Sequence, residues 1–399
     1  MNIVFLYAGE ILPERGGVQR VTHVLSDYIE SKGLNVYYLS LAKKGGSLVL
    51  SPRQYFLPYT TNIEKNYFFY INFLKTKNIS VVINQSGISP EISALAYEAS
   101  KINVKVISVI NNSILTGIKN FSSLYKTKAE KLKLSWLLPL TDIKTINRFL
   151  LFLYKLKYQK HYKVLCEKSD KVILLSEQFR EELNYITGNR NYNNILSISN
   201  PVSFSPEIVD LRNKKNELLF VGRIDTLHKR VDLLLEIWNK LNVQFPDWQL
   251  KIVGGGDEMD KVVNLSKKLG LQRVFFEGFQ NPTAYYRDAS IFCMTSSTES
   301  FGMVLLEAMQ YGTVPFAFNS YLSVTDIIDH EQNGILIPPF DCDKYAEELS
   351  SLMRDKFRRE RISEMAQIKA KKFSIEKIGD IWLNLFEELY LKRKLNSNI

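Results

Sequence analysis

Short runs rich in Val, Ile and Phe alternate along the chain with longer segments of helical periodicity. A parallel sheet that is buried on both faces produces such apolar runs, and its crossover helices produce the segments between them. The first half predicts strands at Ile3–Ala8, Val36–Leu41, Val81–Asn84, Val104–Ile110 and Val172–Ser176. The second half predicts strands at Leu218–Val221, Leu250–Val253, Val274–Glu277, Ile291–Thr295, Val314–Phe318 and Ile335–Ile337. Both halves therefore indicate a doubly wound α/β domain.

The length of 399 residues exceeds what one hydrophobic core usually supports. The segment Ser197–Pro206 carries two prolines and leads into a charged, loop-like stretch, which favours a hinge there. We therefore predict an N-terminal domain over 1–203, a C-terminal domain over 204–374 and a last amphipathic helix within 375–399.

The net charge of +10 is concentrated in residues 113–168, which separate two predicted strands of the first domain. This insert holds Lys119, Lys126, Lys128, Lys131, Lys133, Lys144, Arg148, Lys155, Lys157, Lys160, Lys163 and Lys168 against Glu130, Asp142 and Glu167. The rest of the chain is nearly neutral, so we expect no nucleic-acid binding and instead a local anionic partner. The apolar runs Leu134–Leu140 and Phe149–Tyr154 favour an anionic membrane surface. The alternative is that these apolar residues close the core of the first domain while the lysines are solvated.

The three cysteines, Cys166, Cys293 and Cys342, form no C-x-x-C pair, so we expect no metal or redox motif and a reducing compartment. The apolar start of the chain meets Glu10 too soon for a signal peptide. No apolar stretch approaches the roughly 20 residues of a membrane-spanning helix. These features predict a protein of the cytoplasm or of the inner face of the cell membrane.

The segment Ser296–Met309 follows a predicted strand and carries Glu299 and Glu307 eight positions apart. If most of this step is helical, the two carboxylates lie roughly 12 Å apart along the axis, which is comparable to a diphosphate that joins a ribose to a sugar. The helix start offers the amides of Phe301, Gly302 and Met303 to a phosphate. Glu307 then suits ribose hydroxyls and Glu299 suits sugar hydroxyls. The alternative is a loop acid and an exposed helix acid without a ligand.

Three further loops follow predicted strands of the second half. Arg223 and Lys229 belong to the first of these loops. They are suited to clamping a diphosphate, although a solvated basic loop is the alternative. Gly254-Gly255-Gly256-Asp257 lacks the third glycine of a dinucleotide fingerprint, so we expect a tight turn. The backbone of Gly278 and Phe279 is placed to face a nucleobase.

In the first half, Glu14-Arg15-Gly16-Gly17 joins the first strand to the first helix. Paired glycines let backbone amides approach a phosphate or an acceptor hydroxyl, and a flexible turn is the alternative.

An ordered set of these features spans nearly the whole chain. It comprises Gly16-Gly17-Val18, Ser176-Glu177, Asn200-Pro201-Val202, Val221-Gly222-Arg223 with Lys229, Gly254-Gly255-Gly256-Asp257, and Glu299 with Glu307. This set resembles family 4 of the glycosyltransferases, with its E-x7-E motif. The resemblance implies the GT-B fold of two Rossmann-like domains facing across a cleft, with a last helix that crosses back to the first domain. It also implies retention of anomeric configuration and no metal or cofactor, since the nucleotide-sugar is a substrate.

Carried over residue by residue, the resemblance places Arg223 and Lys229 on the diphosphate, Glu307 on the ribose and Glu299 on the donor sugar. Gly16 and Gly17 fall near the diphosphate and acceptor. Members of the family often carry a histidine that contacts the donor sugar after the fourth or fifth strand of the first domain, and here Asn111 stands in that region. Asn111 retains hydrogen-bonding capacity but supplies no imidazole.

The sequence therefore predicts a retaining hexosyl- or N-acetylhexosaminyl-transferase. Its donor is a nucleotide-diphosphate-sugar, UDP being favoured over GDP, and its acceptor is a lipid-linked glycan of bacterial surface polysaccharide or glycoconjugate assembly. The alternatives are a nucleotide-sugar epimerase of the same architecture and a non-catalytic nucleotide-sugar-binding partner.

Overall fold

The computed structural model describes residues 1–13, 16–41, 51–60, 62–120, 144–202 and 209–397, with the backbone alone at 144–145 and 392–397. The chain forms two compact units. The first comprises Met1–Asn112, Leu153–Ser203 and Phe373–Ile399, and the second comprises Ser113–Phe152 and Phe204–Lys372.

The first unit is built on a parallel sheet, which has seven strands in the described residues, in the order β3-β2-β1-β4-β5-β6-β7. Its strands are β1 (Asn2–Tyr7), β2 (Asn35–Ser40), β3 (Gln54–Phe56), β4 (Ile79–Asn84), β5 (Lys105–Ile110), β6 (Lys171–Leu174) and β7 (Ile195–Ser197). Its helices include α1 (Gly17–Ser31), α2 (Tyr67–Thr76), α3 (Pro90–Tyr97), α7 (Phe179–Thr187) and α15 (Ile375–Ser397). The strand order changes direction between β1 and β4, which makes the sheet doubly wound.

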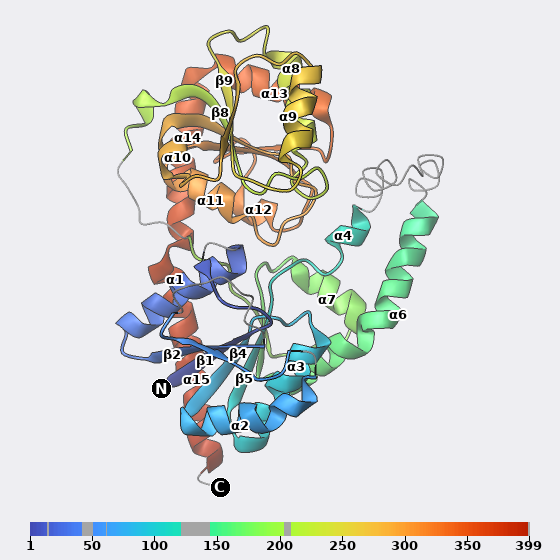
Figure 1. Cartoon of the computed structure of the whole chain (residues 1–399), viewed down its shortest axis with the longest axis vertical. Helices are drawn as coiled ribbons and strands as arrows, with labels where there is room; N and C mark the ends of the chain where they lie inside the picture. The colour runs from blue at the N-terminus through green and yellow to red at the C-terminus, as the bar shows by residue number, and fades with distance from the viewer. Residues whose placement is uncertain (14–15, 42–50, 61, 121–143, 203–208, 398–399) are drawn as a thin grey trace. The chain divides into compact units, whose positions relative to one another are not determined.

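The second unit repeats this design with six described strands in the order β10-β9-β8-β11-β12-β13. They are β8 (Lys215–Val221), β9 (Gln249–Val253), β10 (Val274–Gly278), β11 (Ala289–Met294), β12 (Val314–Phe318) and β13 (Ile335–Ile337). The helices are α4 (Thr116–Lys119), α8 (Val231–Leu241), α9 (Met259–Lys268), α10 (Thr283–Asp288), α11 (Met303–Gln310), α12 (Val324–Ile327), α13 (Cys342–Arg354) and α14 (Lys356–Ala370). Figure 1 shows helices on both faces of this sheet. The order changes direction between β8 and β11.

Hydrophobic burial explains why these segments form strands. All residues of β11 and β12 are buried, as expected for central strands that are covered by helices on both faces. Trp238 of α8 is fully buried in the core that joins α8 and α13 to the second sheet. The prediction of two doubly wound α/β domains is thus confirmed.

The last helix, α15, packs within the first unit, although the chain directly before Phe373 belongs to the second unit. Tyr28 of α1 donates a hydrogen bond of 2.6 Å from its hydroxyl to the Asp380 carboxylate of α15. Lys171 at the start of β6 forms an ion pair of 3.3 Å with Glu388. Trp382, Phe386 and Leu389 are buried.

The described residues of the insert are divided between the two units, whereas all of the insert was predicted to belong to the first domain. Its residues 113–120 and 144–152 group with the second unit, where the Asn120 amide donates to the carbonyl oxygens of Ser297 and Ser320, each at 2.7 Å. Helix α6 (Lys144–Lys168) contributes to both units. The apolar run Leu134–Leu140 and the lysines at 126, 128, 131 and 133 lie outside the described residues.

Candidate functional site

The strand order of the second unit brings two loops together. β8 and β11 are neighbours, with Leu218 paired to Ile291 and Leu219 to Phe292. After β8 the chain continues through α8 to β9, and after β11 it continues through α11 to β12, so the two connections run in opposite directions from this pair of strands. Ligands of open α/β sheets bind at the carboxyl ends of strands at such a point. The loops at 222–230 and 295–302 therefore form the candidate site of this unit.

Asp225 organises the loop that follows β8. One oxygen of its carboxylate accepts hydrogen bonds from the backbone amides of Leu227 at 3.1 Å, His228 at 2.6 Å and Lys229 at 2.9 Å. The other oxygen accepts from Arg223 Nε at 2.9 Å. Burial alone would raise the pKa of Asp225, but the amides and the Arg223 guanidinium lower it below its usual value. A charged Asp225 thus holds the loop in one conformation and fixes the backbone of Lys229.

Lys229 and Glu299 meet at the centre of this site. The Lys229 Nζ atom lies 2.6 Å from Glu299 Oε1, and the Ser296 hydroxyl donates to the same oxygen at 2.6 Å. The two charged side chains are 18% and 13% exposed, so each is accessible only over a small area. A cation and a carboxylate held side by side match a ligand that carries both an anionic group and hydroxyls.

Hydrogen bonds hold the two loops against each other. The Ser297 amide donates to the His228 carbonyl at 2.7 Å, and the Ser297 hydroxyl donates to the Leu227 carbonyl at 2.8 Å. The Thr295 hydroxyl donates to the Arg230 carbonyl at 2.9 Å. The contact between Lys229 and Glu299 is therefore fixed by the backbones on both sides.

The predicted phosphate-binding turn begins helix α11. Gly302 is the residue before the helix and adopts φ of 100°, and a Cβ there would lie 2.5 Å from the Tyr321 hydroxyl oxygen. Only glycine meets both demands without strain. Phe301 is buried, with 1% of its surface exposed. The expected role of the backbone amides of Phe301, Gly302 and Met303 at this helix start, the binding of a phosphate, stays a prediction.

Glu307 lies on the same helix, and its side chain faces the interior. It is 1% exposed, and its Oε2 atom accepts a hydrogen bond of 3.0 Å from the buried Tyr286 hydroxyl. The carbonyl of Tyr286 accepts in turn from Lys214 Nζ at 2.8 Å and from the Thr313 hydroxyl. The burial of Glu307 contradicts the alternative of an exposed helix acid, and the ribose-binding role of Glu307 stays a prediction.

The remaining predicted residues of the second unit are more dispersed. Arg223 is 64% exposed and is paired with Asp225. Gly278 adopts φ of 68° and accepts a hydrogen bond of 2.7 Å from the Gly254 amide, whereas the Phe279 ring is 81% exposed. A Cβ at Gly254 would lie 1.9 Å from the Gly222 carbonyl oxygen, so this glycine allows two loop backbones to pack together.

Three predicted site residues belong to the first unit. Gly16 precedes α1, and Gly17 is its first residue, so both lie where the helix presents its first amides. Asn111 follows β5 and is 8% exposed. Its amide nitrogen donates to the Gln85 carbonyl at 2.7 Å and to the Gln85 side-chain oxygen at 3.1 Å. Asn111 therefore connects the ends of β4 and β5.

Several residues that support the site were not predicted from the sequence. Asp225 follows Arg223 by two positions and precedes α8. An aspartate at such a position is a recognised signal for a loop in which the carboxylate accepts hydrogen bonds from the backbone amides that follow it. Ser296 is adjacent to the predicted strand end. No sequence signal identifies Tyr286, because its link to Glu307 across 21 positions depends on how α10 packs on α11.

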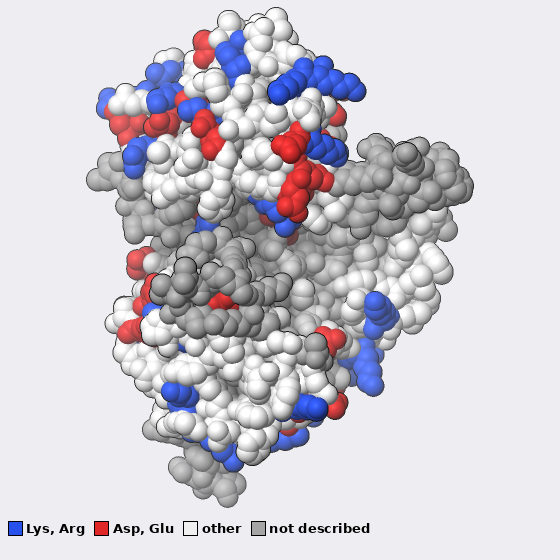
Figure 2. Space-filling view, viewed as in Figure 1, with Lys and Arg blue, Asp and Glu red and all other residues white. Residues whose placement is uncertain are grey.

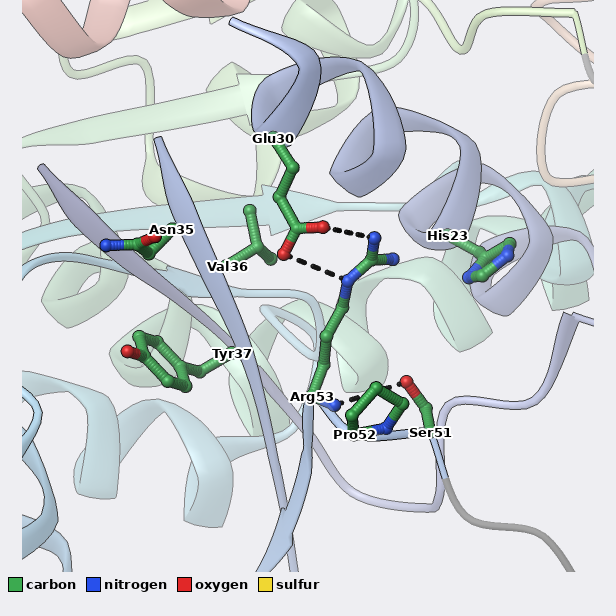
Figure 3. Close-up of a pocket in the computed structure, with 8 residues that line it drawn as sticks. All are labelled: His23, Glu30, Asn35, Val36, Tyr37, Ser51, Pro52 and Arg53. Atoms are coloured by element: carbon green, nitrogen blue, oxygen red, sulfur yellow. Dashed lines mark hydrogen bonds and ion pairs between the residues drawn. The ribbon is translucent and has the colours of Figure 1, made fainter. Parts of the chain in front are cut away.

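A cavity of about 420 Å³ in the first unit contains none of the predicted site residues. His23, Glu30, Tyr37 and Arg53 are among the residues that line it (Figure 3). Arg53 forms ion pairs with Glu30 and, at 2.8 Å, with Asp27. Although burial alone would lower the pKa of Arg53, its bonds to Glu30 and Tyr38 raise it. Since two carboxylates already neutralise Arg53, this cavity offers no comparable site for an anion.

Two further features concern the described residues. No cluster of three or more His, Cys, Asp or Glu side chains there is arranged to hold a metal ion. Among the described helices, none is both long and apolar enough to cross a membrane.

Solved structures share the fold. The lipopolysaccharide outer core galactosyltransferase WaaB superposes with a TM-score of 0.70 at 20% identity, over 97% of this chain and all of that one. The fold is therefore that of the GT-B glycosyltransferases, which are built from two parallel-sheet α/β domains.

Sequence comparison identifies the second unit more closely. Residues 203–369 match the family model of glycosyl transferases group 1, so this unit carries a glycosyltransferase group 1 domain. An uncharacterized glycosyltransferase of Haemophilus influenzae is 33% identical over 48% of this chain. A Campylobacter jejuni N-acetyl-D-galactosaminyltransferase that acts on an undecaprenol-linked glycan is 27% identical, also over 48%. The matches span 54% of the length of each of these relatives.

Proposed function

We propose that this protein is a retaining glycosyltransferase that moves a hexose or N-acetylhexosamine from a nucleotide-diphosphate-sugar to a glycan acceptor. The observation that carries the proposal is the contact between Lys229 and Glu299, at the reversal point of a sheet within a glycosyltransferase group 1 domain. This pair supplies a cation for the diphosphate and a carboxylate for sugar hydroxyls.

The chemistry requires stabilisation of the leaving group. As the sugar leaves, negative charge grows on the β-phosphate, and Lys229 with the first amides of α11 is placed to stabilise it. The exposed Arg223 supplies a second cation for the diphosphate. Gly278 and Phe279 face the nucleobase, Glu307 binds the ribose, and Asn111 binds a sugar hydroxyl. In front-face transfer the departing phosphate takes the acceptor's proton, so the enzyme contributes positioning and charge stabilisation.

The proposed donor is a UDP-sugar, and the proposed acceptor is lipid-linked, in bacterial surface polysaccharide or glycoconjugate assembly. The acceptor proposal is supported by the undecaprenol-linked substrate in the name of the Campylobacter jejuni relative. Gly16 and Gly17 lie near the acceptor in this proposal, on the first unit.

Substitution of the charged site residues tests the donor site. Lys229→Ala and Glu307→Ala should each lower kcat/KM at least about tenfold, which is a loss of about 1.4 kcal/mol of transition-state stabilisation. The matched controls are Lys267→Ala on α9 and Glu364→Ala on α14, whose side chains are exposed away from the loops. Near wild-type kcat/KM in folded Lys229→Ala or Glu307→Ala protein would remove the assignment.

Product analysis tests the reaction class. Donor consumption should depend on a lipid-linked acceptor, and the product should retain the anomeric configuration of the donor, in assays that compare UDP- and GDP-sugars. Rearranged or hydrolysed donor without acceptor would instead identify an epimerase. Binding without turnover across donors and acceptors would identify a non-catalytic partner.

A further inference from the structure

Helix α6 combines a dense positive charge with exposed large apolar side chains. Its 25 residues, Lys144–Lys168, include seven Lys or Arg, and the first acid in the sequence of the helix is Glu167. Phe149, Phe152, Leu153 and Leu156 are 58%, 52%, 44% and 60% exposed. We refer to these four residues as the apolar stripe.

The spacing of the apolar stripe places it on one side of the helix. Positions separated by three, four and seven residues lie above one another on a helix, and the four residues follow this spacing from Phe149. Arg148, Lys157 and Lys160 are exposed next to the stripe. Figure 2 shows the surface over α6 as mainly white, with blue side chains beside it. Contiguous exposed apolar groups that are flanked by polar ones mark an interaction surface.

The opposite side of the helix packs against the first unit. Tyr162, Leu165 and Cys166 are buried near its C-terminal end. The His161 ring nitrogen lies 2.8 Å from the Gly87 carbonyl oxygen. These contacts leave the apolar stripe, nearer the N-terminal end, without a role in the core.

Charge selects among the possible occupants of the stripe. A second copy of the same helix would bring two strongly positive surfaces together, and like charges repel. Residues 121–143 also carry more Lys than acids in their sequence. An anionic lipid surface, in contrast, attracts the lysines and accepts the apolar side chains between its headgroups.

We infer that α6 is an interfacial helix that docks the protein on an anionic bilayer, with the apolar stripe inserted between headgroups and Arg148, Lys157 and Lys160 at the lipid phosphates. In this inference α6 lies along the membrane surface, because its apolar stripe occupies one side of the helix and the buried Tyr162, Leu165 and Cys166 hold the other side. This docking is independent of the proposed donor chemistry, because it uses none of the residues assigned to it. The sequence predicted a membrane contact for the insert as a whole, and the present inference assigns this contact to four apolar and three charged residues of α6.

Vesicle sedimentation of the full-length protein tests this inference. Vesicles of equal parts phosphatidylglycerol and phosphatidylcholine are compared with vesicles of phosphatidylcholine alone, at low and high salt and without any nucleotide-sugar. The apolar variant carries Phe149→Gln, Phe152→Gln, Leu153→Gln and Leu156→Gln, and the charge variant carries Lys157→Gln and Lys160→Gln. Their matched controls are Val243→Gln with Phe357→Gln and Lys267→Gln with Lys268→Gln, all at exposed positions of the second unit.

We expect wild-type protein to bind the anionic vesicles, to bind less at high salt and to leave the phosphatidylcholine vesicles unbound. Each α6 variant should have a partition coefficient lower by at least about tenfold, while both controls bind as the wild type does. Amide exchange in α6 should slow when anionic vesicles are added. Because the charge variant replaces only two exposed lysines and no apolar side chain, it keeps the test valid if the apolar variant fails to fold.

Three outcomes would overturn the inference. They are no binding to anionic vesicles, equal binding by the wild type and the charge variant, or an equal loss of binding in a control. A concentration-dependent dimer that the apolar variant abolishes, in protein that does not bind vesicles, would identify a second copy as the occupant. Normal donor turnover in a variant that no longer binds vesicles would leave the proposed function intact.

Discussion

The Tyr286 hydroxyl donates a hydrogen bond of 3.0 Å to the buried Glu307 carboxylate. Tyr286 also lies against the Tyr311 ring, with centroids 6.1 Å apart and planes within 13°. The ring therefore stays packed when only the hydroxyl is removed. This geometry makes Tyr286 a positioning residue for Glu307, if Glu307 binds the ribose as proposed.

We predict that Tyr286→Phe raises KM for the nucleotide-sugar several-fold and changes kcat less, because the loss falls on donor binding. The matched control is Tyr345→Phe in the same unit, which loses a buried hydroxyl bonded to the Phe316 carbonyl at 2.9 Å. Both variants should lose about 1 kcal/mol of stability. Steady-state kinetics checks this, and an unchanged KM in Tyr286→Phe would argue against the positioning role.

Lys214 is the residue whose charge makes the stability of the second unit depend on pH. Burial lowers the pKa of its ammonium to about 7, and nearby Asp288 only partly opposes this. Between that value and the ordinary lysine pKa, the unfolded chain binds a proton that the folded chain lacks. Stability therefore rises with pH across this window, by about 1.4 kcal/mol per pH unit. Below the window the buried ammonium lowers the stability by an amount that no longer changes with pH.

We predict that Lys214→Met removes this contribution. The difference in melting temperature between the wild type and Lys214→Met should shift in favour of the wild type as the pH rises from neutral to alkaline. Comparing the two proteins cancels the titration of the tyrosines and cysteines that they share. A difference that stays constant with pH would show that Lys214 is not buried in its neutral form.

At the scale of elements, the start of α11 depends on Gly302. We predict that Gly302→Ala destabilises the fold by about 1–3 kcal/mol through its backbone strain alone and also lowers donor affinity, because the new Cβ displaces Tyr321 or the turn. Gly270→Ala is the control, since Gly270 has φ of 64° with nothing near its Cβ position. Thermal melts and nucleotide titration separate the two effects. Equal donor affinity in both variants would show that the turn before α11 does not contribute to donor binding.

The elements themselves were largely predictable. The observed bounds of β12 and β13 are those predicted, and the central strands agree within a few residues. β3 and β7 were missed because each has only three residues and pairs with a single neighbour at the sheet edge, so neither needs a long apolar run. In the second unit, each of the six described strands was predicted.

At the scale of the whole molecule, the chain's last helix completes the first unit. Trp382 is 4% exposed, and its ring lies 5.8 Å from that of Phe386. We predict that Trp382→Ala lowers stability by about 3–5 kcal/mol, seen as an earlier melting transition of the first unit. Ile381→Ala, at an adjacent position that is 46% exposed, is the control. Equal effects of the two changes would contradict this packing.

The sequence by itself determined the fold class, since runs buried on both faces and separated by amphipathic helices have few other solutions than a parallel sheet. It also identified Lys229 and Glu299 as candidate ligand-binding residues. Their contact was decided by tertiary structure, because the 70 positions between them are bridged only when β8 pairs with β11. Tertiary structure likewise decided that Glu307 faces Tyr286 and not solvent. Periodicity records which residues are buried, whereas the partners of a buried polar group depend on strand order and helix packing.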